Sequence, residues 1–141
     1  MTTPVGILNH GKSYLKAARH LLDEIVTQRL SLPFDDPVSL LLGHSIELIL
    51  KACLHHKIGN APKSRDLLSL RTLAISHACV FDLDRAEQGH LGLLNNVFGG
   101  PPYKVRYLTT GVATTHDDKI ILGIAARFAD EATQLIPGAA R

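Results

Sequence analysis

The sequence predicts an all-α protein, an antiparallel up-and-down bundle of four to five helices. Leucine and alanine, which form helices readily, supply most of an apolar fraction of 45%, while aromatic residues make up only 5%. Apolar residues recur at steps of three and four rather than in alternation, and this is the period of a helix. A chain of 141 residues can bury one self-contained core. We therefore expect a single domain over residues 1–141.

The first expected helix lies in the N-terminal segment. Its apolar residues form one stripe: Leu8, Leu15, Ala18, Leu22 and Ile25. Charged residues occupy the other side: Lys12, Lys16, Arg19 and Asp23. This pattern predicts an amphipathic helix that buries one face.

The second segment, residues 38–54, is apolar on nearly all sides. We expect it to be the central and most buried helix of the bundle. Asp36 suits the N-cap and Pro37 the first helical position, where a missing N–H has no consequence. Gly59 supplies the left-handed residue that commonly ends a helix.

Two shorter helices are expected next. One begins near Ser64 and carries its apolar residues at helical spacing: Leu67, Leu70, Leu73, Ala74 and Ala78. The other begins at Asp84, where Glu87 completes a capping box, and it ends before the turn at residues 99–102. Residues 103–108 are expected to form either a loop or a single strand.

The last helix is expected to open at Thr115, with Asp117 and Asp118 in its first turn, where carboxylates complement the positive helix end. Its apolar side consists of Ile121, Ile124, Ala125, Phe128, Ala132 and Leu135. Pro137 and the glycine that follows it close the helix.

Compartment is inferred from cysteines and hydropathy. Cys53 and Cys79 lie in apolar stretches and are interpreted as small core residues rather than a disulfide pair. The first residues do not resemble a signal peptide, and no apolar run approaches the roughly 20 residues of a membrane span. We therefore expect a cytoplasmic protein without membrane contact.

The net charge of +2 is too small to indicate nucleic-acid binding by itself. The charge is unevenly distributed, because residues 51–71 hold five basic side chains and one acidic one. Two interpretations stay open: an ordinary solvated surface, or a patch that attracts phosphate groups.

A polar stripe crosses the expected central helix. His44, Glu47, Lys51 and His55 recur at spacings of three and four, so they share one face of a helix. The stripe could be an edge in contact with water, a seam that fixes register in a bundle or dimer, or a cleft wall that offers an acid, a base and a cation.

The sequence carries no recognisable motif for binding a metal or a cofactor. The chain has no His–Glu–x–x–His pattern, and its cysteines lack the spacing of metal ligands. No glycine pattern follows a strand, which argues against dinucleotide and P-loop sites. No metal and no cofactor is expected.

Four stretches together resemble the HEPN family of small prokaryotic helical proteins. Residues 14–22 (YLKAARHLL) resemble its first helix, and residues 43–54 (GHSIELILKACL) resemble its second, with a Glu–Leu–x–x–Lys–Ala–x–Leu pattern. Residues 65–70 (RDLLSL) are similar to its His–Asp–Leu–x–x–Leu element. Residues 104–107 (KVRY) are similar to a late Arg–Tyr pair.

The resemblance implies a helical bundle, usually dimeric, that is associated with nucleotide or RNA chemistry. It implies a homodimer as the assembly and a nucleotide, RNA or a partner protein such as a nucleotidyltransferase-type antitoxin as the ligand. The residues expected to contact the ligand are His44, Glu47, Lys51, Arg65, Arg106 and Tyr107.

Some HEPN proteins are metal-independent ribonucleases of toxin–antitoxin or antiviral systems, and these carry an Arg followed four to six residues later by a His. The chain departs from this pattern, since Arg65 stands where the family has a His and Arg106 has no His within reach. Two other pairs have the spacing, Arg71 with His77 and Arg85 with His90.

Two functional hypotheses follow. The first is a HEPN-like module, non-catalytic or dependent on a partner, that dimerises or binds a nucleotide or RNA. The alternative is a HEPN ribonuclease that cleaves RNA at a dimer cleft, where arginine would act on the phosphate and histidine in proton transfer.

Overall fold

The computed structural model describes residues 2–27, 35–98 and 116–139, which form five helices and, within these ranges, no strand. The helices are α1 (Pro4–Val26), α2 (Asp35–Ile58), α3 (Leu67–Ser76), α4 (Arg85–Phe98) and α5 (Asp118–Leu135). The expected all-α bundle is confirmed. Residues 103–108, for which a loop or a strand was expected, lie outside the described ranges.

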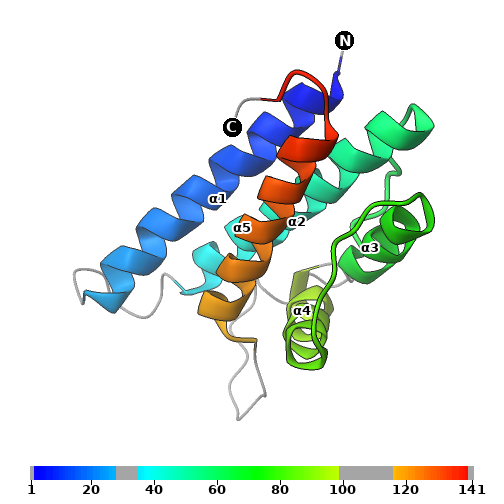
Figure 1. Ribbon diagram of the computed structural model, residues 1–141. Coiled ribbons are helices and arrows are strands. Elements are labelled where there is room, and N and C mark those ends of the chain that lie inside the picture. Colours follow the sequence, from blue (N-terminus) through cyan, green and yellow to red (C-terminus); the bar gives the residue numbers. More distant parts are fainter. Residues whose placement is uncertain (1, 28–34, 99–115, 140–141) are drawn as a thin grey trace.

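The helices are arranged around α2. Figure 1 shows α1 and α2 running in opposite directions, with α5 lying along both and the shorter α3 and α4 on the other side of α2. Helix α2 contacts each of the other four helices. It is therefore the element that joins the long helices to the α3–α4 pair.

Burial confirms that α2 is the central helix. Many of its side chains have no exposed surface at all: Val38, Leu42, Ile46, Ile49, Leu50, Ala52, Cys53 and Leu54. The stripe expected on α1 is buried at Leu8, Leu15, Ala18 and Leu22, and Ile25 is partly buried. On α5, Ile121, Ile124, Ala125, Phe128 and Ala132 are buried and Leu135 is partly buried.

The apolar character of α2 also bears on the membrane. Within the described part of the chain, Pro37–Ile58 is long and apolar enough to span a bilayer by length and composition, with a mean hydropathy of 1.4. The core helix of a soluble protein passes the same test. Two-thirds of the apolar window (67%) is buried inside the bundle, as the core position of α2 requires.

The side-chain cap expected at the start of α4 is present. In α4, the Asp84 N–H donates to Glu87 Oε1 (3.0 Å) and the Glu87 N–H donates to Asp84 Oδ1 (2.8 Å). This is the expected capping box.

The C-terminal end of α2 also agrees with expectation. Gly59 has a φ of +84° directly after the last helical residue, and this conformation favours glycine.

Three starts differ from expectation. Helix α2 begins at Asp35, so Asp36 lies inside the first turn. Helix α3 begins at Leu67 rather than near Ser64, because the Asp66 carboxylate accepts from the N–H groups of the first turn. Helix α5 begins at Asp118 with Asp117 as its N-cap, and Thr115 lies outside the described residues.

Helices α1 and α2 approach closely at a pair of small residues. The Ser45 hydroxyl is fully buried and donates to the backbone oxygen of Gly11 (2.8 Å). A Cβ at Gly11 would lie 3.0 Å from Cγ1 of Ile49. The absence of a side chain at Gly11 therefore allows the two helices to approach closely. The buried Ser45 hydroxyl finds its hydrogen-bond partner across this contact.

The two cysteines occupy the core as expected. Both are free thiols, and both are buried. Burial raises the pKa of Cys53 to about 12, and burial also raises the pKa of Cys79 above the ordinary thiol value. Both thiols therefore stay protonated near neutral pH, where only a thiolate would be nucleophilic.

Truncation of the central helix tests this arrangement. We expect Ile49→Ala, at a position with no exposed surface, to lower the free energy of unfolding by about 2–5 kcal/mol, because the lost methylenes leave a cavity. Urea denaturation measures this change. Leu48→Ala, at a partly buried position, should cost less, and equal losses at both positions would contradict the placement of α2.

Candidate functional site

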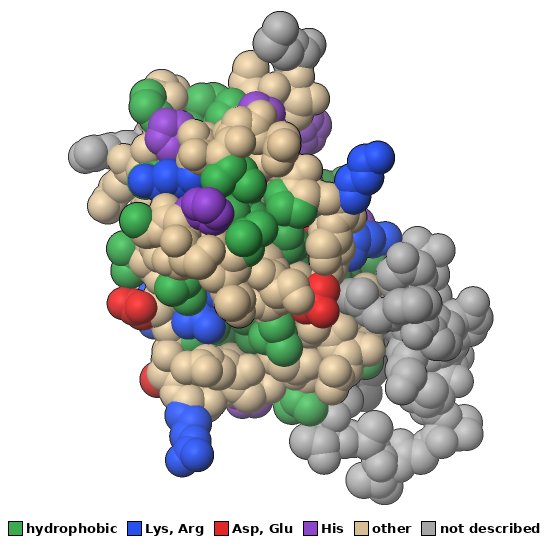
Figure 2. All heavy atoms as spheres, turned by 90° about the vertical axis from the view of Figure 1, so that its right-hand side faces the viewer, with side chains coloured by type: hydrophobic (Ala, Val, Ile, Leu, Met, Phe, Trp, Pro, Cys, Tyr) green, Lys and Arg blue, Asp and Glu red, His purple; other side chains and the backbone are tan. Residues whose placement is uncertain are grey.

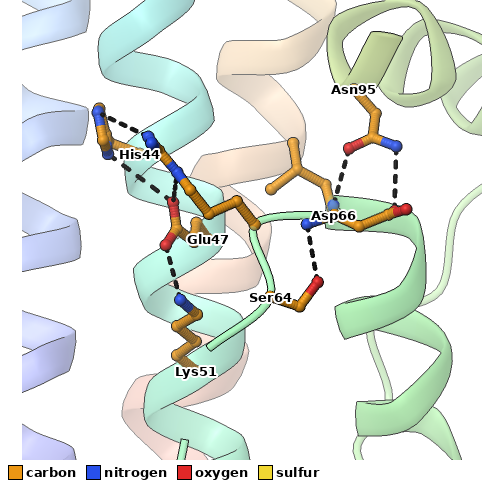
Figure 3. Close-up of polar contacts among 8 residues, drawn as sticks. His44, Glu47, Lys51, Ser64, Asp66 and Asn95 are labelled. Carbon is orange, nitrogen blue, oxygen red and sulfur yellow. Dashed lines mark hydrogen bonds and ion pairs between the residues drawn. The ribbon is translucent and has the colours of Figure 1, made fainter. Parts of the chain in front are cut away.

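The polar stripe of α2 is centred on a buried carboxylate. Glu47 is a charged residue in a mostly apolar helix, and it is only 7% exposed. Its Oε2 accepts from Lys51 Nζ at 2.8 Å, and its Oε1 lies 3.5 Å from Nε of Arg65. Figure 3 shows these contacts converging on Glu47 from α2 and from the segment before α3.

His44 completes the group on the same helix. Its Nδ1 lies 3.8 Å from Glu47 Oε1, and its Nε2 lies 3.4 Å from a terminal nitrogen of Arg65. The imidazole ring is stacked with Tyr14 of α1, with ring centres 5.4 Å apart. The imidazole also meets the ring of Phe98 of α4 in an edge-to-face arrangement, with ring centres 5.1 Å apart. Three helices therefore hold this ring.

We call these six residues the Glu47 cluster: Tyr14, His44, Glu47, Lys51, Arg65 and Phe98. The Arg65 guanidinium carbon lies 5.1 Å from the centre of the Phe98 ring, within the range of a cation–π contact. Arg65 is thus oriented by a carboxylate, an imidazole and an aromatic ring.

The chain before α3 positions Arg65. The carboxylate of Asp66 caps α3, and the Asp66 N–H donates to Ser64 Oγ (3.0 Å). Asn95 of α4 donates to Asp66 Oδ1 (3.1 Å) and accepts from the Leu67 N–H (2.8 Å). Figure 3 shows Asn95 facing this turn. These bonds fix the backbone on the C-terminal side of Arg65.

The charges of the cluster do not cancel. One carboxylate faces the ammonium of Lys51 and the guanidinium of Arg65, so the local net charge is +1 with His44 neutral. The side chains of His44 and Arg65 are 31% and 29% exposed, whereas Lys51 is 14% exposed. Within the cluster, the excess positive charge therefore comes closest to solvent at the guanidinium, beside the neutral imidazole, an arrangement suited to an anion.

The cluster also contains an unmet hydrogen-bonding group. Among the described residues, Glu47 Oε1 is buried and accepts no hydrogen bond. It lies near two nitrogens, of Arg65 and His44, at 3.5 and 3.8 Å. A buried carboxylate oxygen is costly without donors, so a closer approach of the Arg65 guanidinium or of the His44 imidazole would stabilise it.

Four of the six residues expected to contact a ligand are brought together. His44, Glu47 and Lys51 lie on one face of α2, as their spacing predicted, and Arg65 joins them from the next segment. The other two, Arg106 and Tyr107, lie outside the described residues.

The first Arg–His pair is held apart by other contacts. Arg71 Nε donates to the backbone oxygen of Phe81 (2.8 Å), while Glu131 Oε2 accepts from the Phe81 N–H (2.7 Å). Phe81 has a φ of +44°, which is strained for an aromatic residue. Arg71 thus stabilises this turn, and His77 is exposed at the C-cap of α3.

In the second pair, Arg85 and His90, the histidine also contacts another part of the chain. His90 Nδ1 accepts from the Asp117 N–H at 3.0 Å, where it supports the start of α5. Arg85 is exposed in the first position of α4. Within the described ranges, no hydrogen bond or ion pair joins either arginine to its histidine.

Sequence reasoning did not assign Tyr14 and Phe98 to the site. Tyr14 is 37% exposed on α1, whereas Phe98 is buried at the end of α4. Tyr14 is 30 residues from His44 in the sequence, and Phe98 is 54 residues from it. On a helix, Tyr14 is the neighbour of Gly11 and Ala18 at spacings of three and four, so it borders the apolar stripe and gave no separate signal. Phe98 gave none, because its apolar spacing already suited the core.

A second polar cluster, also unexpected, joins α2 to the start of α5. His116 Nε2 lies 2.9 Å from Ser39 Oγ and 2.8 Å from Asp118 Oδ1, and Ser39 Oγ donates to the same carboxylate oxygen (3.2 Å). A catalytic triad needs the hydroxyl and the carboxylate on different nitrogens of the imidazole. Here one nitrogen meets both, so the cluster acts as a tie between helices.

Metal ligands are not grouped in the described residues: no set of three or more His, Cys, Asp or Glu side chains is placed to hold an ion there. Comparison with known proteins adds no assignment. No family model, no curated protein and no solved structure matches the chain.

The contact between Gly43 and Phe98 can be tested first. A Cβ at Gly43 would overlap the Phe98 ring, lying 2.6 Å from its Cγ. We expect Gly43→Ala to lower the free energy of unfolding by about 1–3 kcal/mol through overpacking. Gly123→Ala, in open space on α5, should instead add about 0.5–1 kcal/mol by helix propensity. A stabilised Gly43→Ala variant would contradict the packing of α4 on α2.

Removal of the central negative charge is a second test. We expect Glu47→Gln to destabilise the protein by about 1–3 kcal/mol, because Lys51 and Arg65 lose their common anionic partner. Asp130→Asn neutralises an exposed acid on α5 and should change stability by less than about 0.5 kcal/mol. Thermal or urea denaturation compares the two variants, and equal changes would mean that Glu47 does not organise the cluster.

Proposed function

We propose that the chain is a non-catalytic nucleotide- or RNA-binding module of HEPN-like type, and that a phosphate group of the ligand binds at the Glu47 cluster. The observation that carries the proposal is the imbalance of charge at a partly buried site. One carboxylate of the cluster faces two cations, Lys51 and Arg65, and the more exposed of them, Arg65, lies beside His44.

The chemistry of the exposed groups favours phosphate. A guanidinium offers a planar fork of donors that suits phosphate oxygens. Arg65 is already oriented by Glu47 and Phe98, so less side-chain freedom would be lost on binding. Tyr14 lies beside His44 and is partly exposed, and nucleobases commonly stack on such rings.

The surface supports recognition at a single point. Figure 2 shows the face on the right-hand side of Figure 1, where Lys, Arg and His side chains lie scattered between hydrophobic ones. Of the basic residues in the segment 51–71, Lys57 and Lys63 are exposed, whereas Arg71 is bonded to Phe81. Few phosphates should therefore be neutralised at once, and a long basic track is not needed.

The ordered resemblance to HEPN proteins supports the same class of ligand. It also implies a homodimer and a partner protein, and these stay predictions. The ribonuclease alternative requires an arginine and a histidine on one phosphate. Arg71 and His90 each stabilise a turn instead. Cleavage of transfer RNA that is lost in His90→Ala or His77→Ala would favour the alternative.

Arg65→Ala tests the proposed site. We expect the affinity for a short, fluorescein-labelled single-stranded RNA to fall by about tenfold, because the most exposed fixed cation of the cluster is removed. The slope of log affinity against log salt should decrease by about 0.7, the value for one phosphate contact on a single strand. Fluorescence anisotropy over a salt series measures both quantities.

A matched control removes the same charge elsewhere. Arg19→Ala, at an exposed position of α1, should keep the wild-type affinity and salt slope to within about twofold. If wild-type protein binds no RNA or nucleotide, or if Arg65→Ala and Arg19→Ala behave alike, the Glu47 cluster is not the binding site.

A further inference from the structure

The position of His44 within the cluster has a consequence for how a ligand binds. Its imidazole lies beside the ion pair of Glu47 and Arg65, with Glu47 Oε1 3.8 Å from Nδ1 and an Arg65 nitrogen 3.4 Å from Nε2. Arginine can only donate hydrogen bonds. In the neutral ring, Nε2 is therefore the acceptor and the proton lies on Nδ1, facing Glu47.

Protonation changes this contact from attractive to repulsive. A proton added to Nε2 would point at the guanidinium, so two donors and two positive charges would face each other. The ring itself has little freedom to turn away, because Tyr14 stacks on one face and Phe98 contacts it from another direction. The positive charge that the ring gains therefore stays beside Arg65, whose side chain is 29% exposed.

Protonation also increases the unbalanced charge. Among the contacts described for residues 2–27, 35–98 and 116–139, the ionisable groups around His44 are Tyr14 from α1, Glu47 and Lys51 from α2, and Arg65 before α3. The residue from α4, Phe98, carries no charge. With one carboxylate and two permanent cations, the cluster passes from +1 to +2 when the imidazole takes up a proton. An anion is then favoured by the added positive charge.

We propose that His44 couples phosphate binding at the Glu47 cluster to the uptake of one proton, so that the ligand binds more tightly in mildly acidic solution. The inference rests on the proposed function. Its sign follows from linkage: if the protonated cluster binds the anion better, the bound anion must in turn favour the protonated imidazole. Histidine is the side chain that ordinarily titrates in the range where this would act.

The experiment measures binding at two pH values with two probes. A short single-stranded RNA and adenosine monophosphate are titrated into wild-type protein and His44→Gln at about pH 6 and about pH 8. We expect wild-type protein to bind about tenfold more tightly at the lower pH. His44→Gln, which is neutral at both values, should bind with the same affinity at both pH values, whatever that affinity is. A pH effect confined to RNA would assign the coupling to the polymer, and one shared by both probes assigns it to the phosphate group.

Matched controls separate the possible failures. His20→Gln, at an exposed position of α1, should retain the wild-type pH dependence. Binding that depends on Arg65 but not on pH, or a pH effect that persists in His44→Gln, would overturn the coupling and leave the proposed function intact. Absence of binding at both values would overturn both proposals.

A readout without ligand gives a further check. Nitrogen-15 spectra of the imidazoles at about pH 8 report which ring nitrogen carries the proton. We expect an unprotonated Nε2 in His44. Addition of adenosine monophosphate near the midpoint of the His44 titration should increase the protonated fraction, and an unchanged fraction would contradict the proposal.

Discussion

The arrangement of this protein depends on a carboxylate buried in its most apolar helix. Glu47 sits in α2, which packs against every other helix of the bundle. A carboxylate at such a position is costly unless cations and donors approach it. Lys51 meets this need from the next turn, and Arg65 does so from the chain that leads into α3. The burial of the Glu47 carboxylate thus links the core to the position of the segment that precedes α3.

That link explains why the α3–α4 pair is placed as it is. Arg65 is held near Glu47 because Asp66 caps α3 and because Asn95 of α4 bonds to the same turn. Phe98, at the end of α4, lies over Gly43, where a side chain would collide with its ring. The same ring contacts His44 and Arg65. Packing and electrostatics therefore act through one small set of residues.

The Glu47 cluster holds more positive than negative charge, and both functional proposals follow from this excess. Two permanent cations surround one carboxylate, and the exposed part of that excess is a guanidinium beside an imidazole. Cations held in place by an internal anion are suited to binding an external one, because their side chains are already ordered. Of the Arg–His pairs suggested by spacing, Arg71 contributes instead to the turn at Phe81, and His90 contributes to the start of α5 at Asp117.

Local rules sufficed for much of the fold. The period of the apolar residues located five helices, and capping chemistry placed the start of α4 at Asp84. Helical spacing also put His44, Glu47 and Lys51 on one face of α2, because residues three and four apart are neighbours on a helix. Each of these features is set within a few residues of chain, so sequence alone determined them. Only the tertiary structure decided that Tyr14, Arg65 and Phe98 join that face. These contacts span 18 to 54 residues of sequence from His44 or Glu47, and packing of whole helices, which no local pattern encodes, brings them together.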